Sequence, residues 1–185
     1  MIRFKTSILA RALAVSVATL AFTVGASAAG DKTAYDQSKA SAKTTYESST
    51  KACDAMSGNA KDICVAEAKA ARVKTDEEAE ASYKNTPKAH EHAAHEIAEA
   101  NYKVAKERCD DKAGNEKDVC VKEAKAAMIK AQADAKASYK STDAHMDAAK
   151  DKREANYKVA AEKCDAMAGD AKSACVAQAK SKYGM

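Results

Sequence analysis

A pair of cysteines with ten residues between them occurs three times in this chain, and a tyrosine precedes each pair by seven residues. The first cysteine of the pair recurs after 56 and then 55 residues. A repeat of this kind predicts three copies of one supersecondary unit. We expect repeats over residues 29–85, 86–141 and 142–185, the last of which is truncated.

One glycine lies between the two cysteines of each pair, and a residue type that commonly caps helices follows it. The glycines are Gly58, Gly114 and Gly169, and the residues after them are Asn59, Asn115 and Asp170. Glycine adopts the left-handed backbone that closes a helix. An Asn or Asp side chain accepts hydrogen bonds from the first amides of the next helix. Each unit is therefore predicted to be an αα-hairpin with a tight turn at the glycine.

The two cysteines of a pair lie five residues before the glycine and six residues after it, at similar distances from the predicted turn. Helices that pack through alanine approach closely enough for a disulfide, which requires Cα atoms about 5.5–6 Å apart. We therefore predict the disulfides Cys53–Cys64, Cys109–Cys120 and Cys164–Cys175. Each short closed loop is expected to contribute roughly 3 kcal/mol to stability. The alternative uses of cysteine are disfavoured because the chain has no C-x-x-C motif and no histidine near the pairs.

Bulky apolar residues are scarce between residues 29 and 185, which contain 39 Ala but no Leu, Phe or Trp. Three Ile and seven Val are the remaining members of this apolar group. A globular domain with a share of Leu, Ile, Val and Phe below about 20% lacks a conventional core. The composition therefore excludes an α/β or all-β enzyme with a filled interior. Ala, Lys and Glu favour helices, so we expect an all-α protein in which disulfides replace part of the core.

Turn signals divide the chain into six expected helices. They span residues 31–57, 60–84, 87–112, 116–140, 143–167 and 170–183. Thr86 and Pro87 suit an N-cap and a first helical position, so they predict a break between repeats 1 and 2. Ser141, Thr142 and Asp143 mark the equivalent place without proline, where a continuous helix is also compatible. The pattern leaves open whether the hairpins form an elongated array or a loose bundle.

The tyrosine of each repeat is the largest apolar group near the cysteines. These residues are Tyr46, Tyr102 and Tyr157. Each lies two helical turns before a cysteine and therefore on the same helix face. We predict that they pack beside the disulfides, and the alternative is contact with a partner.

The first 28 residues have the three parts of a secretion signal. Arg3 and Lys5 are basic, Ala12 to Val24 is an apolar run, and small residues surround Ala28, where we expect cleavage. A chain without these residues carries 28 basic and 27 acidic side chains, a balance that argues against nucleic-acid binding. We expect a periplasmic or secreted protein with no transmembrane segment after cleavage.

Three of the four histidines lie within six residues, as His90, His92 and His95. His92 and His95 have the i,i+3 spacing of helical chelating pairs for copper, zinc or nickel. The alternative is a solvated helix start, and His145 in the next repeat has no such companions. A metal site here is a hypothesis, and otherwise we expect no cofactor.

The phrase at Ala100–Ala127, A-N-Y-K-V-A followed by C-D and K-D-V-C-V-K-E-A-K-A-A, resembles repeats of uncharacterised Ala/Lys-rich periplasmic proteins of Gram-negative bacteria. Such proteins are sometimes labelled as envelope-biogenesis proteins, because their composition is similar to the helical stalk of the Tol envelope protein. The resemblance implies a periplasmic address and no established activity, and it transfers no functional residue.

We find no nucleophile elbow, P-loop or Gly-rich phosphate cradle, so we expect no catalytic residues and no enzymatic activity. The sequence favours an exported, non-enzymatic helical repeat protein with a structural, interaction or stress-protective role in the cell envelope. The alternative is a periplasmic protein that binds a divalent metal through His90, His92 and His95. A third hypothesis is a chaperone-like binder of unfolded chains. An envelope protein is the partner we expect, and the oligomeric state stays open.

Overall fold

The computed structural model describes residues 30–185, which form five α-helices and no strands. The helices are α1 (Lys32–Cys53), α2 (Gly58–Lys84), α3 (Pro87–Cys109), α4 (Gly114–Cys164) and α5 (Gly169–Tyr183). The expected all-α fold of disulfide-linked helical hairpins is confirmed. The predicted secretion signal and its cleavage near Ala28 lie outside the described residues.

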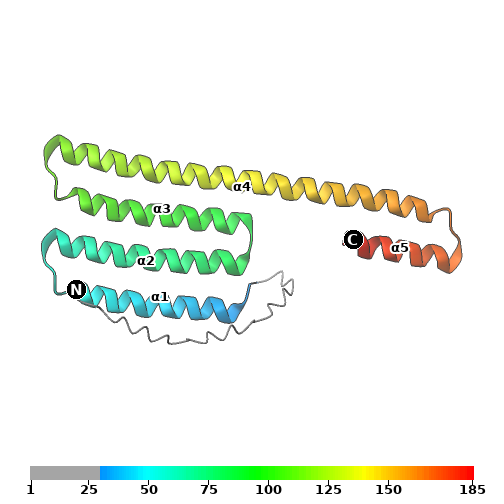
Figure 1. Ribbon diagram of the computed structural model, residues 1–185, viewed down its shortest axis with the longest axis horizontal. Coiled ribbons are helices and arrows are strands. Elements are labelled where there is room, and N and C mark those ends of the chain that lie inside the picture. Colours follow the sequence, from blue (N-terminus) through cyan, green and yellow to red (C-terminus); the bar gives the residue numbers. More distant parts are fainter. Residues whose placement is uncertain (1–29) are drawn as a thin grey trace, which may run out of the picture.

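The helices α1, α2, α3 and the first half of α4 lie side by side as one antiparallel layer (Figure 1). Each helix contacts the one before it and the one after it in the chain, and α1 does not contact α3. The hairpins therefore form an elongated array and not a bundle. The second half of α4 continues beyond the layer, and α5 folds back against its far end (Figure 1).

Small side chains make up the buried part of the layer. The buried residues are Ala42, Cys53, Ala68, Ala81, Ala93, Ala98, Ala100, Val104, Cys109, Cys164 and Ala179. Neighbouring helices meet through these alanines and cysteines, because no Leu or Phe is available to fill a wider gap. Within residues 30–185, no polar or charged residue is buried. No helix in this same range is both long and apolar enough to cross a membrane.

Each hairpin is closed by one disulfide, and the pairs are those that the repeat predicts: Cys53–Cys64, Cys109–Cys120 and Cys164–Cys175. The Cα atoms of these pairs are 5.7, 5.8 and 5.7 Å apart. The first cysteine of each pair is buried. The disulfides therefore sit inside the contact between the two helices, at the end where the chain turns.

The turns themselves differ from the prediction. The first helix of each hairpin ends at its cysteine, and the second helix begins at the glycine. The N-caps are Ser57, Ala113 and Ala168, so the capping role predicted for Asn59, Asn115 and Asp170 is wrong. Contacting helices have axes about 8–10 Å apart, and crossing that distance takes a longer connection than one glycine. The glycines Gly58, Gly114 and Gly169 still have the expected positive φ, at 57°, 56° and 58°.

The three turns share one ion pair that spans the connection. An aspartate follows the first cysteine, and a lysine lies three residues after the glycine. The pairs are Asp54–Lys61 at 2.9 Å, Asp110–Lys117 at 3.0 Å and Asp165–Lys172 at 2.9 Å. All six side chains are exposed, so each pair contributes about 0.2–1 kcal/mol at most. The pairs orient the turn, and the disulfide supplies most of its stability.

The chain reverses between hairpins 1 and 2, as predicted. Asn85 ends α2 in the left-handed conformation with φ 45°, and its amide donates to the Ala81 carbonyl at 2.8 Å. The Thr86 hydroxyl then accepts from the Ala89 amide at 3.1 Å, and Pro87 starts α3. These caps satisfy both helix ends at the reversal.

The break expected at Ser141–Asp143 is absent, and the two helices predicted over 116–140 and 143–167 are one helix of 51 residues. Thr142 stands where repeat 2 has Pro87, so its amide remains a donor and the ladder continues. Residues 141–153 are exposed on every side. Strong helix formers and the 3.8 Å pair between Lys150 and Glu154 support this bare segment.

Removal of the distal disulfide is expected to unfold α5 selectively. α5 contacts α4 alone, whereas α3 contacts both α2 and α4. We predict that Cys164→Ala with Cys175→Ala costs about 3 kcal/mol locally, which raises amide exchange in α5 roughly a hundredfold. Hydrogen exchange read by mass spectrometry measures this. Cys109→Ala with Cys120→Ala is the matched control, in which α3 stays protected; equal loss of protection in α3 and α5 would contradict the prediction.

A proline at position 143 is expected to bend α4. The substitution Asp143→Pro removes a helical hydrogen bond and introduces a steric clash worth about 3 kcal/mol, and the bare segment has no neighbour to hold it straight. Small-angle X-ray scattering coupled to chromatography is predicted to show a shorter maximum dimension than for the unchanged protein. Asp143→Ala, which keeps the amide, should leave the dimension unchanged. The same dimension in both variants would refute the prediction.

Candidate functional site

A hollow in the described part of the chain lies on one face of the layer, over α1, α2 and α3. It measures about 670 Å³. Its apolar floor consists of small side chains from α2 and α3, namely Val65, Ala66, Ala70, Val73 and Ala100. Both basic and acidic side chains lie along its rim. The basic ones are Lys61, Lys69, Arg72 and Lys103, and the acidic ones are Asp62, Asp76 and Glu107. We call this feature the α2 groove.

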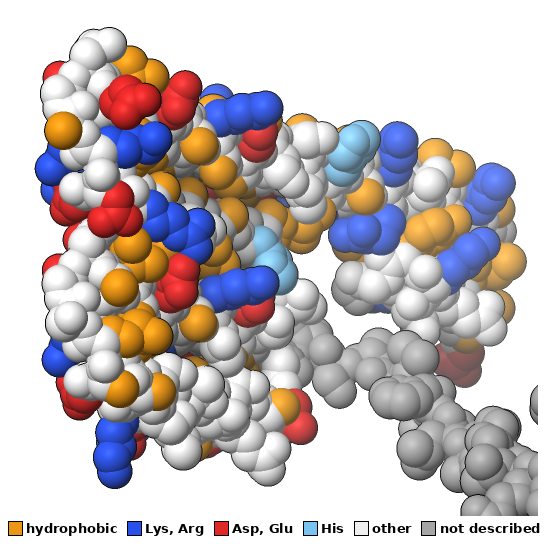
Figure 2. All heavy atoms as spheres, turned by 60° about the vertical axis from the view of Figure 1, so that its left-hand side comes forward, with side chains coloured by type: hydrophobic (Ala, Val, Ile, Leu, Met, Phe, Trp, Pro, Cys, Tyr) orange, Lys and Arg blue, Asp and Glu red, His pale blue; other side chains and the backbone are white. Residues whose placement is uncertain are grey.

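The groove exists because the layer lacks bulky side chains. Two neighbouring helices leave a furrow between them, and alanine does not fill it. The flanking Lys, Asp and Glu side chains extend to solvent and form the walls. Basic and acidic side chains are interspersed with apolar ones on the face seen in Figure 2, with no area of one sign. This surface suits a partner of mixed charge better than a polyanion.

Arg72 is the best-positioned charged residue of the groove. Its guanidinium carbon lies 5.3 Å from the centre of the Tyr46 ring, within the range of a cation–π interaction. Its Nε donates to Asp76 at 3.4 Å, and Lys39 of α1 lies 3.6 Å from the same carboxylate. The Asp76 side chain is only 17% exposed, so these two cations compensate its partial burial. The network connects α1 to α2 beside the groove.

Tyr46, Tyr102 and Tyr157 are all half-buried, and their packing beside the disulfides stays a prediction. The Arg72 network was missed from the sequence because Arg72 and Asp76 resemble an ordinary i,i+4 pair on an exposed helix face. Comparison of the repeats would have singled out this pair, because hairpin 2 has Met128 and Gln132 at the positions equivalent to Arg72 and Asp76. The charged pair is therefore specific to hairpin 1.

The structure does not bring the three histidines of the cluster together, and a metal site there stays a hypothesis. Across residues 30–185, no three or more His, Cys, Asp or Glu side chains are grouped so that they could hold a metal ion. His92 faces α2, with Nε2 4.0 Å from Glu77, and His95 faces α4, with Nδ1 3.4 Å from the Gln132 amide. His90 lines a separate hollow between the start of α3 and the middle of α4.

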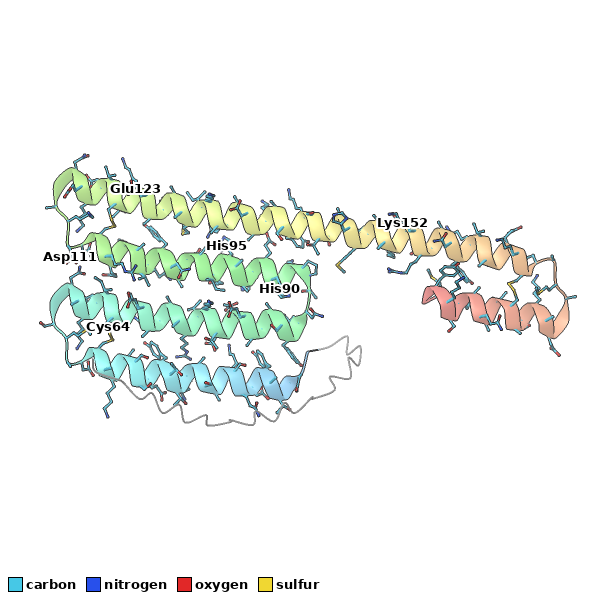
Figure 3. All side chains as sticks on the ribbon, viewed as in Figure 1. Cys64, His90, His95, Asp111, Glu123 and Lys152 are labelled. Carbon is cyan, nitrogen blue, oxygen red and sulfur yellow. A yellow bond between two sulfur atoms is a disulfide. The ribbon has the colours of Figure 1, made fainter. Side chains whose placement is uncertain are left out.

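The divergence of the histidines follows from the place of α3 in the layer. α3 has a neighbour on each side, and its polar side chains extend toward one or the other. Figure 3 labels His90 and His95 at different points along α3. The i,i+3 spacing in the sequence is correct, but His92 lies toward α2 and His95 lies toward α4, so the three rings do not converge.

One pair of charged groups has shifted pKa values, at the end of α2. The Lys84 ammonium donates to Glu80 at 2.6 Å, which lowers the pKa of the Glu80 carboxyl. The same hydrogen bond raises the pKa of Lys84. Lys84 is 56% and Glu80 32% exposed, so the pair is an ion pair near the surface at the helix end. It helps to hold α2 at the reversal into α3.

Replacement of Arg72 tests whether its network supports the α1–α2 contact. We predict that Arg72→Met, which installs the residue of hairpin 2, lowers the free energy of unfolding by about 0.5–1 kcal/mol, because the cation–π contact is lost. Urea unfolding monitored by circular dichroism measures the change. Lys69→Met, on the same groove wall, is the control and is expected to be neutral. A neutral Arg72→Met would show that the network is solvated and contributes nothing.

The α2 groove and its Arg72 network are the candidate site in the part of the chain that the structure describes. Comparison of the chain with protein-family models, with curated proteins and with solved structures finds no match. The use of this surface is therefore argued from its own residues.

Proposed function

We propose that this chain is an exported, non-enzymatic repeat protein that acts as a rigid spacer and interaction module in the cell envelope. The observation that carries the proposal is the architecture of the layer: each helical hairpin is closed by a disulfide, and the helices pack through alanine. A protein of this design holds a surface in place and binds through it. Solenoid-like arrays of stacked hairpins serve binding in the same way.

Export is supported by how the disulfides are used. Three buried or half-buried cysteine pairs close the three hairpins, and a core of alanine and valine alone is small for a chain of this length. The fold therefore depends on oxidation. Such disulfides persist in the periplasm or outside the cell, and are rare in a reducing cytosol.

A binding role is supported by the α2 groove. Its floor is apolar, its rim carries both basic and acidic side chains, and Arg72 and Asp76 are held by their contacts. An envelope protein that presents a segment with small apolar and charged side chains fits these features. The long α4 gives the module reach, because a helix of 51 residues is about 75 Å long at 1.5 Å per residue.

The proposed location outside the cytoplasm is tested by cell fractionation and thiol labelling. We expect the protein in the periplasmic fraction, with all six cysteines inert to an alkylating reagent until a reductant and denaturant are added. Cytoplasmic protein with reactive cysteines would refute export.

The binding role is tested by photo-crosslinking in living cells. A crosslinking amino acid at Lys69, inside the α2 groove, is expected to yield one discrete adduct with an envelope protein. The same amino acid at Glu78, an exposed position of α2 outside the groove, is the matched control and should not give that adduct. Identical adducts at both positions, or none at Lys69, would refute the groove as the binding surface.

A further inference from the structure

Among residues 30–185, no helix packs on the side of α4 opposite α3 and α5. α3 and α5 both pack on one side of α4 (Figure 1). The other side carries an apolar stripe at helical spacing, which we call the α4 stripe. It consists of Val119, Ala126, Ala133, Ala137, Ala144, Ala148, Ala155 and Val159. All of these residues are exposed, and Val119 and Val159 are 44% and 57% exposed.

The repeat shows what covers the same residues elsewhere in the molecule. The first half of α4 is the counterpart of α2, and the second half is the counterpart of α3, with offsets of 56 and 55 residues. α2 and α3 pack against each other. Residues that are buried in those two helices are exposed in α4: Ala81 corresponds to Ala137, Ala93 to Ala148, Ala100 to Ala155, and Val104 to Val159. Val104 is 8% exposed and Val159 is 57% exposed.

α4 therefore carries the counterparts of both surfaces that meet between α2 and α3, one in its first half and one in its second half. Because α4 does not break at Asp143, its second half cannot fold onto its first half as α3 folds onto α2. A second α4 in the antiparallel direction places each half against its complement. We propose that two copies of this chain associate along the α4 stripe as an antiparallel pair, and that each half of the contact reproduces the packing of α2 on α3.

The register of the pair follows from the contacts between α2 and α3. The Arg108 guanidinium pairs with Glu67, and His92 lies 4.0 Å from Glu77. Transfer of these positions to α4 places the two-fold axis near residue 142, at the lost turn and close to the middle of the helix. A contact of this kind is isologous: the same stripe serves both copies. It closes after two copies and covers nearly all of α4.

Charges beside the α4 stripe complement each other in this register. Glu123 is the counterpart of Glu67, and Lys163 is the counterpart of Arg108, so the ion pair between α2 and α3 recurs between Glu123 of one copy and Lys163 of the other. Lys152 stands in place of Ile97 in the stripe and comes opposite Asp134 of the second copy. Because the two copies are related by a two-fold axis, each of these ion pairs forms twice. Figure 3 shows Glu123 in the first half of α4 and Lys152 in the second, as an antiparallel pairing requires.

Analytical ultracentrifugation of the oxidised protein over a wide concentration range tests the proposal. We expect a dimer that dissociates on dilution. The variant Ala126→Glu with Ala155→Glu adds charge to the α4 stripe at two exposed positions and is expected to raise the dimer Kd at least a hundredfold. Ala149→Glu, exposed on α4 but outside the stripe, is the matched control and should not change the Kd. Circular dichroism checks that all variants keep their helix content.

Charge reversal tests the register. Glu123→Lys and Lys163→Glu are each expected to weaken the dimer about tenfold, because each places like charges together, and the double variant is expected to restore it. A protein that stays monomeric at every concentration would overturn the proposal. The same holds for a monomer in which the two halves of α4 fold against each other. A dimer that the stripe variant leaves intact would overturn it as well. The test does not involve the α2 groove, so its outcome is independent of the envelope role.

Discussion

The contact between two helices across alanine and a disulfide is the interaction on which this structure depends. Alanine brings the helix axes close, and the cysteines then reach each other with Cα atoms 5.7–5.8 Å apart. Dispersion contacts over such small side chains are modest for each residue. The disulfide compensates by restricting the unfolded chain. Every hairpin uses the same combination, so the molecule is a series of similar local contacts.

This type of contact explains the layer. A bundle surrounds its central space with side chains from four helices, and Leu or Phe normally fills that space. Val104 is the largest aliphatic residue buried in the described chain, so a closed bundle here would enclose a void. A single layer avoids the void because each helix needs only one line of contact with each neighbour. Its consequence is two open faces and two open edges, and these faces and edges are where the groove and the bare side of α4 lie.

Sequence reasoning was accurate where the relevant interactions are local. The cysteine spacing predicts the disulfides, the glycines predict a positive φ, and Thr86 with Pro87 predicts the reversal. It was wrong where a residue type serves two purposes: Asn59 is a common N-cap residue, yet α2 begins one residue before it. The arrangement of the histidines could not be predicted for a different reason. Spacing along α3 says which positions are near each other, but not which neighbouring helix each ring meets.

The sequence by itself determined the hairpins, because their disulfides, turns and helix-forming residues act within about 30 residues of chain. Only the tertiary structure decided how the hairpins follow one another. At Pro87 a missing amide and a left-handed Asn85 turn the chain back on itself; at Thr142 the amide is present, and the helix continues into solvent. The outcome also depends on whether the neighbouring helix surfaces are buried against each other, as α2 and α3 are, or left apart.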